Sequence, residues 1–458
     1  MLKEIMMRYR PQVFRTFSLA AALKVVLFEM FFLLSGNVPA GENDVCVTFT
    51  DSDFFSINTI EIDGIEIQQS SSPVIRVDAY NRVHLLTYNS ADNRLYYLND
   101  SSGRLQVVTT IQPRQGDFFR VTMEIDDTGH PHIVFSVTEE LSTGMVSDAT
   151  QYHTDFFYTE IVDGRMLSPV SVAVVEQKIY MILLRIDRQG LMRIAFTSTT
   201  ESMEQALLSN FYYTHNRSGG FTQPVPIVSN LRELMNPCLE IGHNDFDYAF
   251  GIVHSWEAGG FSVMRWSIDA EGNATEETVY SNAGRNEVAT QIMNLNVARR
   301  SDNLFHLIFQ ETDLYYTNDS SGVFSEPERI AYLREDMVWG GHIVQLAAGS
   351  KGIHAVFNEP EPDSCWNQYY WRQSDHSDPA LLAARVEGIS SSNFSLKINH
   401  VGYLHWIFGC YTGESSNNHW SIFHAESKEP VEDPIEPDSP STPSSSDSGC
   451  FIRTMVSD

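Results

Sequence analysis

One motif recurs seven times along this chain, and it constrains the fold more than any other feature of the sequence. Each copy has a polar turn, in the clearest cases an aspartate six residues before a histidine, followed at once by three or four apolar residues. Because a turn between two short apolar runs is typical of a β-hairpin, each copy predicts two strands. Six clear copies and a seventh, weaker one read VIRVDAYNRVHLLTY from Val74, MEIDDTGHPHIVF from Met123, LLRIDRQGLMRIAF from Leu183, LNVARRSDNLFHLIF from Leu295, VQLAAGSKGIHAVF from Val344, LKINHVGYLHWIF from Leu396, and EIGHNDFDYAFGIVHSW from Glu240.

A second hairpin follows the first and brings each unit to four strands. It has an aromatic run such as YYT, a turn rich in Asp, Asn, Ser and Gly, and another extended run. A period near 50 residues with four strands per unit is the signature of a propeller blade, so we predict an all-β, seven-bladed β-propeller of four-stranded antiparallel blades over residues 71–427. Aligned on the residue after the first turn, the copies form a column, spaced by 48, 61, 58, 55, 48 and 51 residues, of His84, His132, Arg193, Gly251, His306, His354 and His405.

The last blade needs a fourth strand from elsewhere in the chain. Its third strand is predicted in NHWSIFHA, and the residues after it are rich in proline, which cannot donate to a β-ladder. Residues 45–69 contain spare strand-forming sequence, NTIEIDGIEIQ. A ring has no exposed edge only when every blade is complete, so we expect this segment to close the ring within a propeller domain covering residues 41–428.

Residues 1–40 are predicted to be a signal peptide. Five Lys or Arg residues precede the apolar stretch VVLFEMFFLLSG, and Val38 and Ala40 place small residues at the positions that a signal peptidase needs for cleavage after Ala40. The expected location is extracellular or at the cell surface, with the periplasm as an alternative. Because Glu29 interrupts the apolar stretch, a misassigned start codon and an uncleaved anchor are the competing interpretations.

The charge of the chain argues against nucleic acid as a partner. The whole sequence carries a net charge of -29. The first forty residues hold five basic and two acidic residues, which leaves 25 Lys and Arg against 57 Asp and Glu, a net charge of -32, in the rest. Such a surface repels phosphate backbones. It suits either an exported protein that must stay dissolved or one that gathers cations.

The C-terminal segments are predicted to lie outside the propeller. Residues 429–448 consist largely of Pro, Ser and acidic residues, a composition typical of an extended, disordered linker. Residues 449–458 follow, and Gly449, Cys450, Phe451 and Ile452 resemble the Gly-Cys-Phe-Ile element found after such linkers at the C-termini of bacterial exported proteins. The resemblance implies a bacterial source and surface sorting or anchoring through Cys450. The alternative is a frayed tail with an unpaired thiol.

The remaining cysteines show no zinc-ligand spacing. Cys365 and Cys410 fall in equivalent inter-strand loops of the sixth and seventh blades, so a disulfide between them is expected if the protein is exported. Cys46 and Cys238 have no evident partner, and their pairing is an alternative only.

The repeat resembles the bacterial neuraminidase-type repeat of sialidase-like propellers, in which DxxGxxH precedes a YYT hairpin. The resemblance covers about 350 residues and implies the propeller architecture. In the sialidase family it would also imply an arginine triad, a Tyr and Glu pair as nucleophile, and an Asp as acid. The family's Phe-Arg-Ile-Pro motif is absent, and the nearest strand, with Arg76, has Asp in place of the proline. No catalytic residue can therefore be assigned, and the repeat alone does not indicate sialidase activity.

One face of the propeller is predicted to collect acids and arginines. If the two hairpin turns of each blade lie on one face, then the loops between second and third strands and the connections between blades open on the other. The candidate ligand-binding residues in these loops are Glu140, Glu201, Glu257, Glu311 and Glu359, Arg232, Arg285, Arg334 and Arg385, and the aromatic Trp256 and Trp366.

Two interpretations of these loop residues compete. Arginine forks could grip carboxylate or sulfate groups of an acidic glycan, and paired acids with flanking aromatics could bind sugar rings or a calcium ion; no other cofactor is indicated. Alternatively, each arginine pairs with a nearby acid and holds the loops in place. The structural interpretation is the more common for surface ion pairs.

The histidine column is predicted to be structural. Its members recur once per blade beside a turn, too far apart to share a metal, and we expect each to hydrogen-bond the turn aspartate, as in Asp78 with His84 and Asp126 with His132. In the third blade Arg193 can make the same contact to Asp187. HNDFD, from His243, is predicted to be a variant of the same turn rather than a metal site.

These observations predict an exported propeller that acts as a non-catalytic binding or scaffold module for a carbohydrate or an extracellular protein. The alternative is a glycan-active enzyme, either a hydrolase or a lyase, that uses the carboxylates and arginines of the loop face.

Overall fold

The computed structural model describes most of the chain from residue 48 to residue 431. The described residues are 48–49, 55–60, 62–63, 73–89, 92–100, 104–112, 118–141, 151–202, 205–217, 219–231, 234–242, 246–254, 259–283, 292–300, 302–320, 322–332, 344–349, 351–360, 366–373, 379–386, 394–399, 401–412 and 419–431. The chain divides into two units, residues 1–45 and 46–458, and only the second contains described residues. The predicted leader, residues 432–448 of the predicted linker and the C-terminal element, with Ala40, Cys46 and Cys450, lie outside them. Residues 429–431, predicted to begin the linker, are described, and Val431 is buried in the core of blades six and seven.

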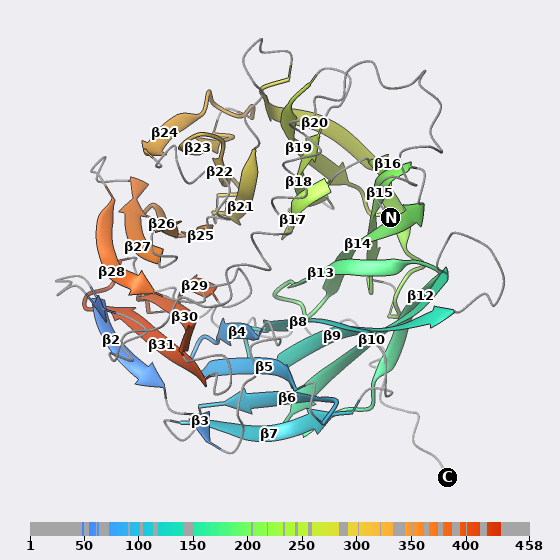
Figure 1. Cartoon of the computed structure of the whole chain (residues 1–458), viewed down its shortest axis with the longest axis horizontal. Helices are drawn as coiled ribbons and strands as arrows, with labels where there is room; N and C mark the ends of the chain where they lie inside the picture. The colour runs from blue at the N-terminus through green and yellow to red at the C-terminus, as the bar shows by residue number, and fades with distance from the viewer. Residues whose placement is uncertain are drawn as a thin grey trace, which may run out of the picture. The chain divides into compact units, whose positions relative to one another are not determined.

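Within the described part of the chain the strands form seven sheets of four antiparallel strands, the blades (Figure 1). Blade one is β4 (Val74–Val77), β5 (Val83–Asn89), β6 (Arg94–Asn99) and β7 (Leu105–Ile111). Blade two is β8 (Phe118–Ile125), β9 (Pro131–Leu141), β10 (Gln151–Val162) and β12 (Val170–Val175), with β11 (Arg165–Met166) beside β10. Blade three is β13 (Lys178–Ile186), β14 (Met192–Ser202), β15 (Gln205–His215) and β16 (Val225–Leu231). Blade four is β17 (Leu234–Ile241), β18 (Asp247–His254), β19 (Phe261–Ile268) and β20 (Ala274–Ser281).

The last three blades repeat the same order. Blade five is β21 (Met293–Arg299), β22 (Phe305–Gln310), β23 (Leu314–Asn318) and β24 (Glu328–Ala331). Blade six is β25 (Val344–Ala348), β26 (Ile353–Pro360), β27 (Trp366–Arg372) and β28 (Ala380–Val386). Blade seven is β29 (Phe394–Ile398), β30 (Leu404–Thr412), β31 (His419–Ser427) and β2 (Phe55–Ile60).

The blades close into a ring, so the protein is a seven-bladed β-propeller. The first strands of neighbouring blades contact one another all the way round, including β29 with β4 (Figure 1). The fourth strand of blade seven is N-terminal, as predicted: β2 pairs antiparallel with β31 from Phe55 opposite Ser427 to Ile60 opposite Ile422. Two short strands extend neighbouring blades, β1 (Thr48–Phe49) antiparallel to β28 and β3 (Ile62–Asp63) parallel to β7.

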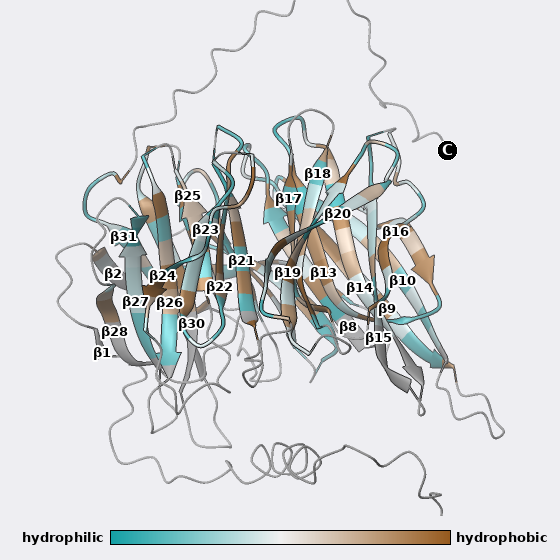
Figure 2. Cartoon of the chain, turned by 90° about the horizontal axis from the view of Figure 1, so that it is seen from above, coloured by the Kyte–Doolittle hydropathy of each residue, from teal (hydrophilic) through white to brown (hydrophobic). Residues whose placement is uncertain are grey.

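The core lies between successive blades. Second strands are buried on both faces, which is why they read as continuous apolar runs rather than as an alternating pattern; all six residues of β22 are buried. Phe156 of blade two and Phe196 of blade three pack across one such interface with ring centroids 4.5 Å apart. In Figure 2 apolar colour covers much of β13, while many connecting turns are polar. This burial supplies the main stabilisation of the ring.

The recurrent aspartate organises the turn between the first two strands of a blade. The Asp126 carboxylate accepts hydrogen bonds from the backbone N–H groups of Thr128 (2.9 Å) and His130 (2.8 Å). Gly129 in this turn has φ 85°, a left-handed conformation that a side chain disfavours. The corresponding Asp78 makes the same two contacts, to Tyr80 and Arg82. Burial opposes ionisation of Asp78, but hydrogen bonds from His84 and Arg82 lower its pKa to about 2.

The histidine column is structural, as predicted, and it has a second partner that the sequence did not indicate. His84 and His132 each lie 3.2 Å from the turn carboxylates of Asp78 and Asp126, and Arg193 contacts Asp187 at 2.7 Å. On the other side, each histidine Nδ1 bonds a tyrosine hydroxyl of the third strand, in the pairs His84 with Tyr97 (2.6 Å), His132 with Tyr158 (2.7 Å), His306 with Tyr316 (2.7 Å) and His354 with Tyr370 (2.8 Å). In blade seven His424 replaces the tyrosine, 2.8 Å from His405.

The assignment of Gly251 to this column was wrong. In blade four the second strand begins at Asp247, so Tyr248 stands opposite Glu240, where blade three has Arg193 and the remaining blades have histidine. Gly251 lies three residues further on, where a Cβ atom would come within 2.6 Å of Leu234. Asp247, the last residue of the HNDFD turn, is buried and contacts Arg193 (3.3 Å) and Arg217 (2.9 Å) of blade three.

Charged side chains also join the innermost strands of blades one to four. Glu124 accepts hydrogen bonds from Arg76 (3.2 Å) and Arg185 (3.1 Å), and Arg185 also donates to Glu240 (3.1 Å). Burial lowers the pKa of Arg185, but the attraction of Glu240 and Glu124 outweighs it and raises the pKa above the usual value. Arg76 therefore has a clear role here in linking two blades.

Candidate functional site

The topology places the predicted ligand-binding residues at one end of the blades. Strands alternate in direction, so the loops between second and third strands and the connections between blades leave at the same end, opposite the hairpin turns. Trp256, Glu257, Arg232, Arg285, Arg334 and Cys365 belong to these loops but lie outside the described residues. For Glu201, Trp366, Arg385 and Cys410 the structure describes only the backbone, as part of β14, β27, β28 and β30.

Three of the predicted acids have described side chains, and their environments differ. Glu140 is exposed near the end of β9, opposite Tyr152 of β10. Glu311 is only 7% exposed and is held between blades four and five. Glu359 is half-buried and lines a groove between blades five and six. The structure therefore does not bring these acids together into one cluster.

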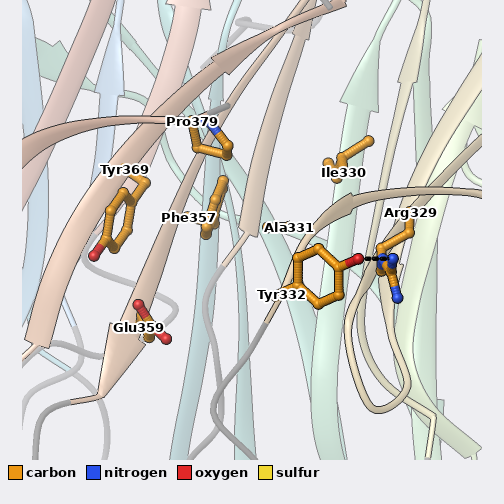
Figure 3. Close-up of a pocket in the computed structure, with 8 residues that line it drawn as sticks. All are labelled: Arg329, Ile330, Ala331, Tyr332, Phe357, Glu359, Tyr369 and Pro379. Carbon is orange, nitrogen blue, oxygen red and sulfur yellow. Dashed lines mark hydrogen bonds between the residues drawn. The ribbon is translucent and has the colours of Figure 1, made fainter. Parts of the chain in front are cut away.

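A groove lies between blades five and six in the described part of the chain. It has a volume of about 360 Å³, within the range of small-molecule sites. The blade-five side is formed by Arg329, Ile330 and Ala331 of β24 with Tyr332, and the blade-six side by Phe357 and Glu359 of β26, Tyr369 of β27 and Pro379. Figure 3 shows Tyr369 and Glu359 on one side and Tyr332 and Arg329 on the other.

Two aromatic rings form the blade-six side. Phe357 and Tyr369 stand opposite each other in the β26–β27 ladder, and their rings stack with centroids 5.6 Å apart and an interplanar angle of 18°. Phe357 is 3% exposed and packs in the core shared by blades five and six. Because residues two apart on a strand share a face, Glu359 projects on the same side as Phe357, toward the loop end.

An arginine and a tyrosine form the opposite side. The Arg329 guanidinium lies 3.6 Å from the ring centroid of Tyr332 and also donates to that residue's hydroxyl. Its other branch contacts Asp313 at 3.3 Å. Tyr332 is 73% exposed, although its neighbours on the strand are half-buried. An exposed aromatic ring held in place by a cation is a typical component of a binding surface.

Of the groove residues, only Glu359 was predicted from the sequence. Arg329, Tyr332, Phe357 and Tyr369 belong to strands that read as ordinary blade sequence. The signal that would have found them is a comparison of fourth strands, where ETVYS of blade four aligns with ERIAY of blade five.

The predicted disulfide between Cys365 and Cys410 lies outside the described side chains. Among the described residues, no three His, Cys, Asp or Glu side chains are grouped so as to hold a metal ion. Cys238 is a free thiol whose pKa burial raises to about 12, so it is poorly reactive at neutral pH. No helix in the described part of the chain is long and apolar enough to span a membrane.

Comparisons with known proteins identify no family for this chain. No protein-family model matches the sequence, and no curated protein matches it as a relative. Among solved structures, the chain is similar to the polysaccharide lyase Uly1, with 11% identity over 77% of this chain and 89% of that one and a TM-score of 0.49. It is also similar to a puromycin-hydrolysing peptidase of Mycobacterium tuberculosis, with 12% identity over 83% and 61% of the two chains and a TM-score of 0.45.

A third similar structure is the Aleuria aurantia lectin in complex with Fucα1-6GlcNAc, with 10% identity over 70% of this chain and 97% of the lectin and a TM-score of 0.39. These three proteins differ in activity, and similarity at this level does not transfer one to the present chain.

Proposed function

We propose that this protein is an exported carbohydrate-binding propeller whose ligand occupies the groove between blades five and six. The observation that carries the proposal is the pairing of aromatic rings with a carboxylate in one small groove. The apolar C–H face of a sugar ring packs on aromatic side chains, and its hydroxyl groups donate to carboxylate oxygens. Tyr332, Tyr369 and Phe357 supply the rings, and Glu359 supplies the acceptor.

The proposal is for binding rather than catalysis. Glycoside hydrolysis with a pair of carboxylates needs separations of about 5 to 5.5 Å or about 6.5 to 9.5 Å across the scissile bond. Among the described residues that line the groove, one is a carboxylate, Glu359. Binding needs only that single acceptor together with the stacking surface.

A glycan array tests the proposed function directly. The purified full chain is expected to bind a restricted set of glycans, both with calcium and with a chelator. Glu359→Ala should lose this binding, whereas Glu140→Ala, which removes an exposed acid from another blade, should keep it. A flat profile for the unmodified chain would overturn the proposal, and release of new reducing ends from a bound glycan would favour the glycan-active alternative.

Export is the second part of the proposal. It is supported by the leader-like residues 1–40 and by the acidic linker with its Gly-Cys-Phe-Ile element. Expression in a bacterial host that exports proteins should yield a mature chain beginning at Gly41 in the periplasm or medium, as read by N-terminal sequencing. A chain that keeps Met1 and remains in the cytoplasm would contradict export without affecting the glycan test.

A further inference from the structure

The outer strands of blades four and five have the same register, which makes Tyr280 and Ala331 equivalent. In blade four Tyr280 stands opposite Val263 and Thr278 opposite Met264, with an irregularity between the two pairs. In blade five Ala331 stands opposite Leu314 and Arg329 opposite Tyr315, with the same irregularity. Glu311 and Glu359 are equivalent too, because each lies five residues after the histidine of the column in its own blade, His306 or His354.

The boundary between blades four and five is filled by the Tyr280 side chain. Its ring stacks on Phe309 of blade five, with centroids 5.0 Å apart and an interplanar angle of 30°. Its hydroxyl donates to Glu311 at 2.9 Å, and the Asn282 amide donates to the other oxygen of the same carboxylate at 2.7 Å. A planar ring with one hydroxyl donor thus fits between an aromatic side chain and a glutamate.

The boundary between blades five and six keeps the receiving surface but lacks the tyrosine ring. Phe357 stacks on Tyr369 with centroids 5.6 Å apart, much as Phe309 stacks on Tyr315 with centroids 5.9 Å apart. Glu359 takes the place of Glu311. Ala331 has no side-chain atoms beyond Cβ, and the groove of about 360 Å³ opens beside it.

We propose that this groove binds a single uncharged, hydroxylated ring, a neutral sugar residue, in the position that Tyr280 fills at the preceding boundary. The ring packs on the Phe357 and Tyr369 side and one hydroxyl donates to Glu359. This inference rests on the proposed carbohydrate-binding function and narrows its ligand class.

The charges around the groove favour a neutral ligand over an acidic one. Arg329, the basic residue of the lining, already contacts Asp313 and covers the Tyr332 ring. A carboxylate or sulfate on the ligand would have to displace Asp313 and approach Glu359, in a chain whose net charge is -29. The arginine-fork interpretation of the sequence therefore does not describe this site.

Refilling the groove tests the inference. The neutral probes are methyl α-D-glucoside, methyl β-D-galactoside, methyl α-D-mannoside and methyl α-L-fucoside. Methyl β-D-glucuronide is the acidic probe, and N-acetyl-L-tyrosinamide is the phenolic probe. Binding to the full chain is measured by saturation-transfer NMR and calorimetry. We expect at least one neutral glycoside to bind. Ala331→Tyr should weaken that binding at least tenfold, and Val323→Tyr, which adds the same ring at an exposed position of the β23–β24 turn, should not change it.

A second variant, Tyr280→Ala, tests the same inference in case Ala331→Tyr disturbs the fold. Tyr280→Ala should open a second groove beside Phe309 and Glu311, which raises the stoichiometry for the same glycoside from one to two. Two outcomes would overturn the inference and leave the proposed function intact. One is a preference for the glucuronide. The other is glycoside binding that Glu359→Ala abolishes but Ala331→Tyr does not change. Binding of the tyrosinamide alone would overturn both and point to a protein side chain as the ligand.

Discussion

The boundaries on the two sides of blade five differ in the side chain that faces an aromatic pair and a glutamate, which is Tyr280 at one boundary and Ala331 at the other. Between blades four and five, Tyr280 fills the space and satisfies Glu311. Between blades five and six, Ala331 leaves a groove in front of the same kind of aromatic pair and an equivalent glutamate. The comparison shows how a repeat fold can create a binding site: two blades carry the same aromatic and glutamate surface, and the groove opens where the side chain that would fill it is absent.

Opening the ring should have the largest effect, because both boundaries depend on neighbouring blades being held in place. A chain lacking residues 41–70 loses β1, β2 and β3 and leaves β31 as an exposed edge. We expect this chain to aggregate and to lose its cooperative thermal transition. A chain lacking residues 432–458 is the control and should unfold like the complete protein. Soluble, cooperatively folding protein after the first deletion would refute the closure scheme.

Replacing the two equivalent glutamates should separate the filled boundary from the open one. Glu311→Leu leaves the Tyr280 hydroxyl and the Asn282 amide without their acceptor in a buried position, which should lower the free energy of unfolding by about 3 kcal/mol. Glu359→Leu, on the wall of a groove, should cost less than about 1 kcal/mol. Urea unfolding of both variants at pH 7.5 measures the difference. Equal losses of unfolding free energy in the two variants would show that Glu359 stabilises the fold as much as Glu311 does.

Acid should weaken the interior of blade five without changing the difference between its two boundaries. Burial lowers the pKa of His306 from the usual 6.5 to about 4, and the nearby Arg300 cation adds to the effect. The unfolded chain then binds a proton more readily than the folded one, so stability falls as the pH drops from about 6.5 and stops falling below about 4. At pH 5 the loss from this residue should be about 2 kcal/mol.

His306→Gln isolates this contribution, because it removes the titrating ring but keeps a polar side chain near Tyr316. The loss of unfolding free energy between pH 7.5 and pH 5 should be about 2 kcal/mol smaller in the variant than in the unmodified chain. Other buried histidines, among them His405 with its pKa lowered to about 3 by burial and by His424, titrate in both proteins and cancel in the difference. An identical pH profile in the two proteins would show that His306 is readily protonated in the fold.

The sequence predicted the fold more completely than the site, and particular residues explain why. Blade number, the closing strand and the histidine contacts to Asp78 and Asp126 follow from local patterns that recur at a regular period. The tyrosine partners of the histidines were missed because they lie on a different strand of the blade, where YYT reads simply as strand-forming sequence. The misplacement of Gly251 arose in the copy whose turn, HNDFD, departs most from the repeat.

The groove escaped prediction for a different reason. Its decisive residue, Ala331, opens the groove because it has no side chain large enough to fill it. An alanine in an outer strand does not by itself indicate a binding site. Recognising it requires the register that aligns Ala331 with Tyr280 and the knowledge that Glu359 occupies the place of Glu311. Composition drew attention instead to the many loop acids, of which the structure shows Glu140 exposed on one blade and Glu311 buried at another.

The smallest expected change in stability comes from filling the groove, and its sign is informative. Ala331→Tyr should place a ring on Phe357 and a hydroxyl near Glu359, as Tyr280 does beside Phe309 and Glu311. An aromatic contact of this kind contributes about 1 kcal/mol, so the variant should be as stable as the unmodified chain or about 1 kcal/mol more stable. Val323→Tyr should leave stability unchanged. Since a ring forced into a packed interface would instead cost about 1 to 3 kcal/mol, a clear loss of stability would mean that the two boundaries do not share one shape and that the groove is not the vacant place of a tyrosine.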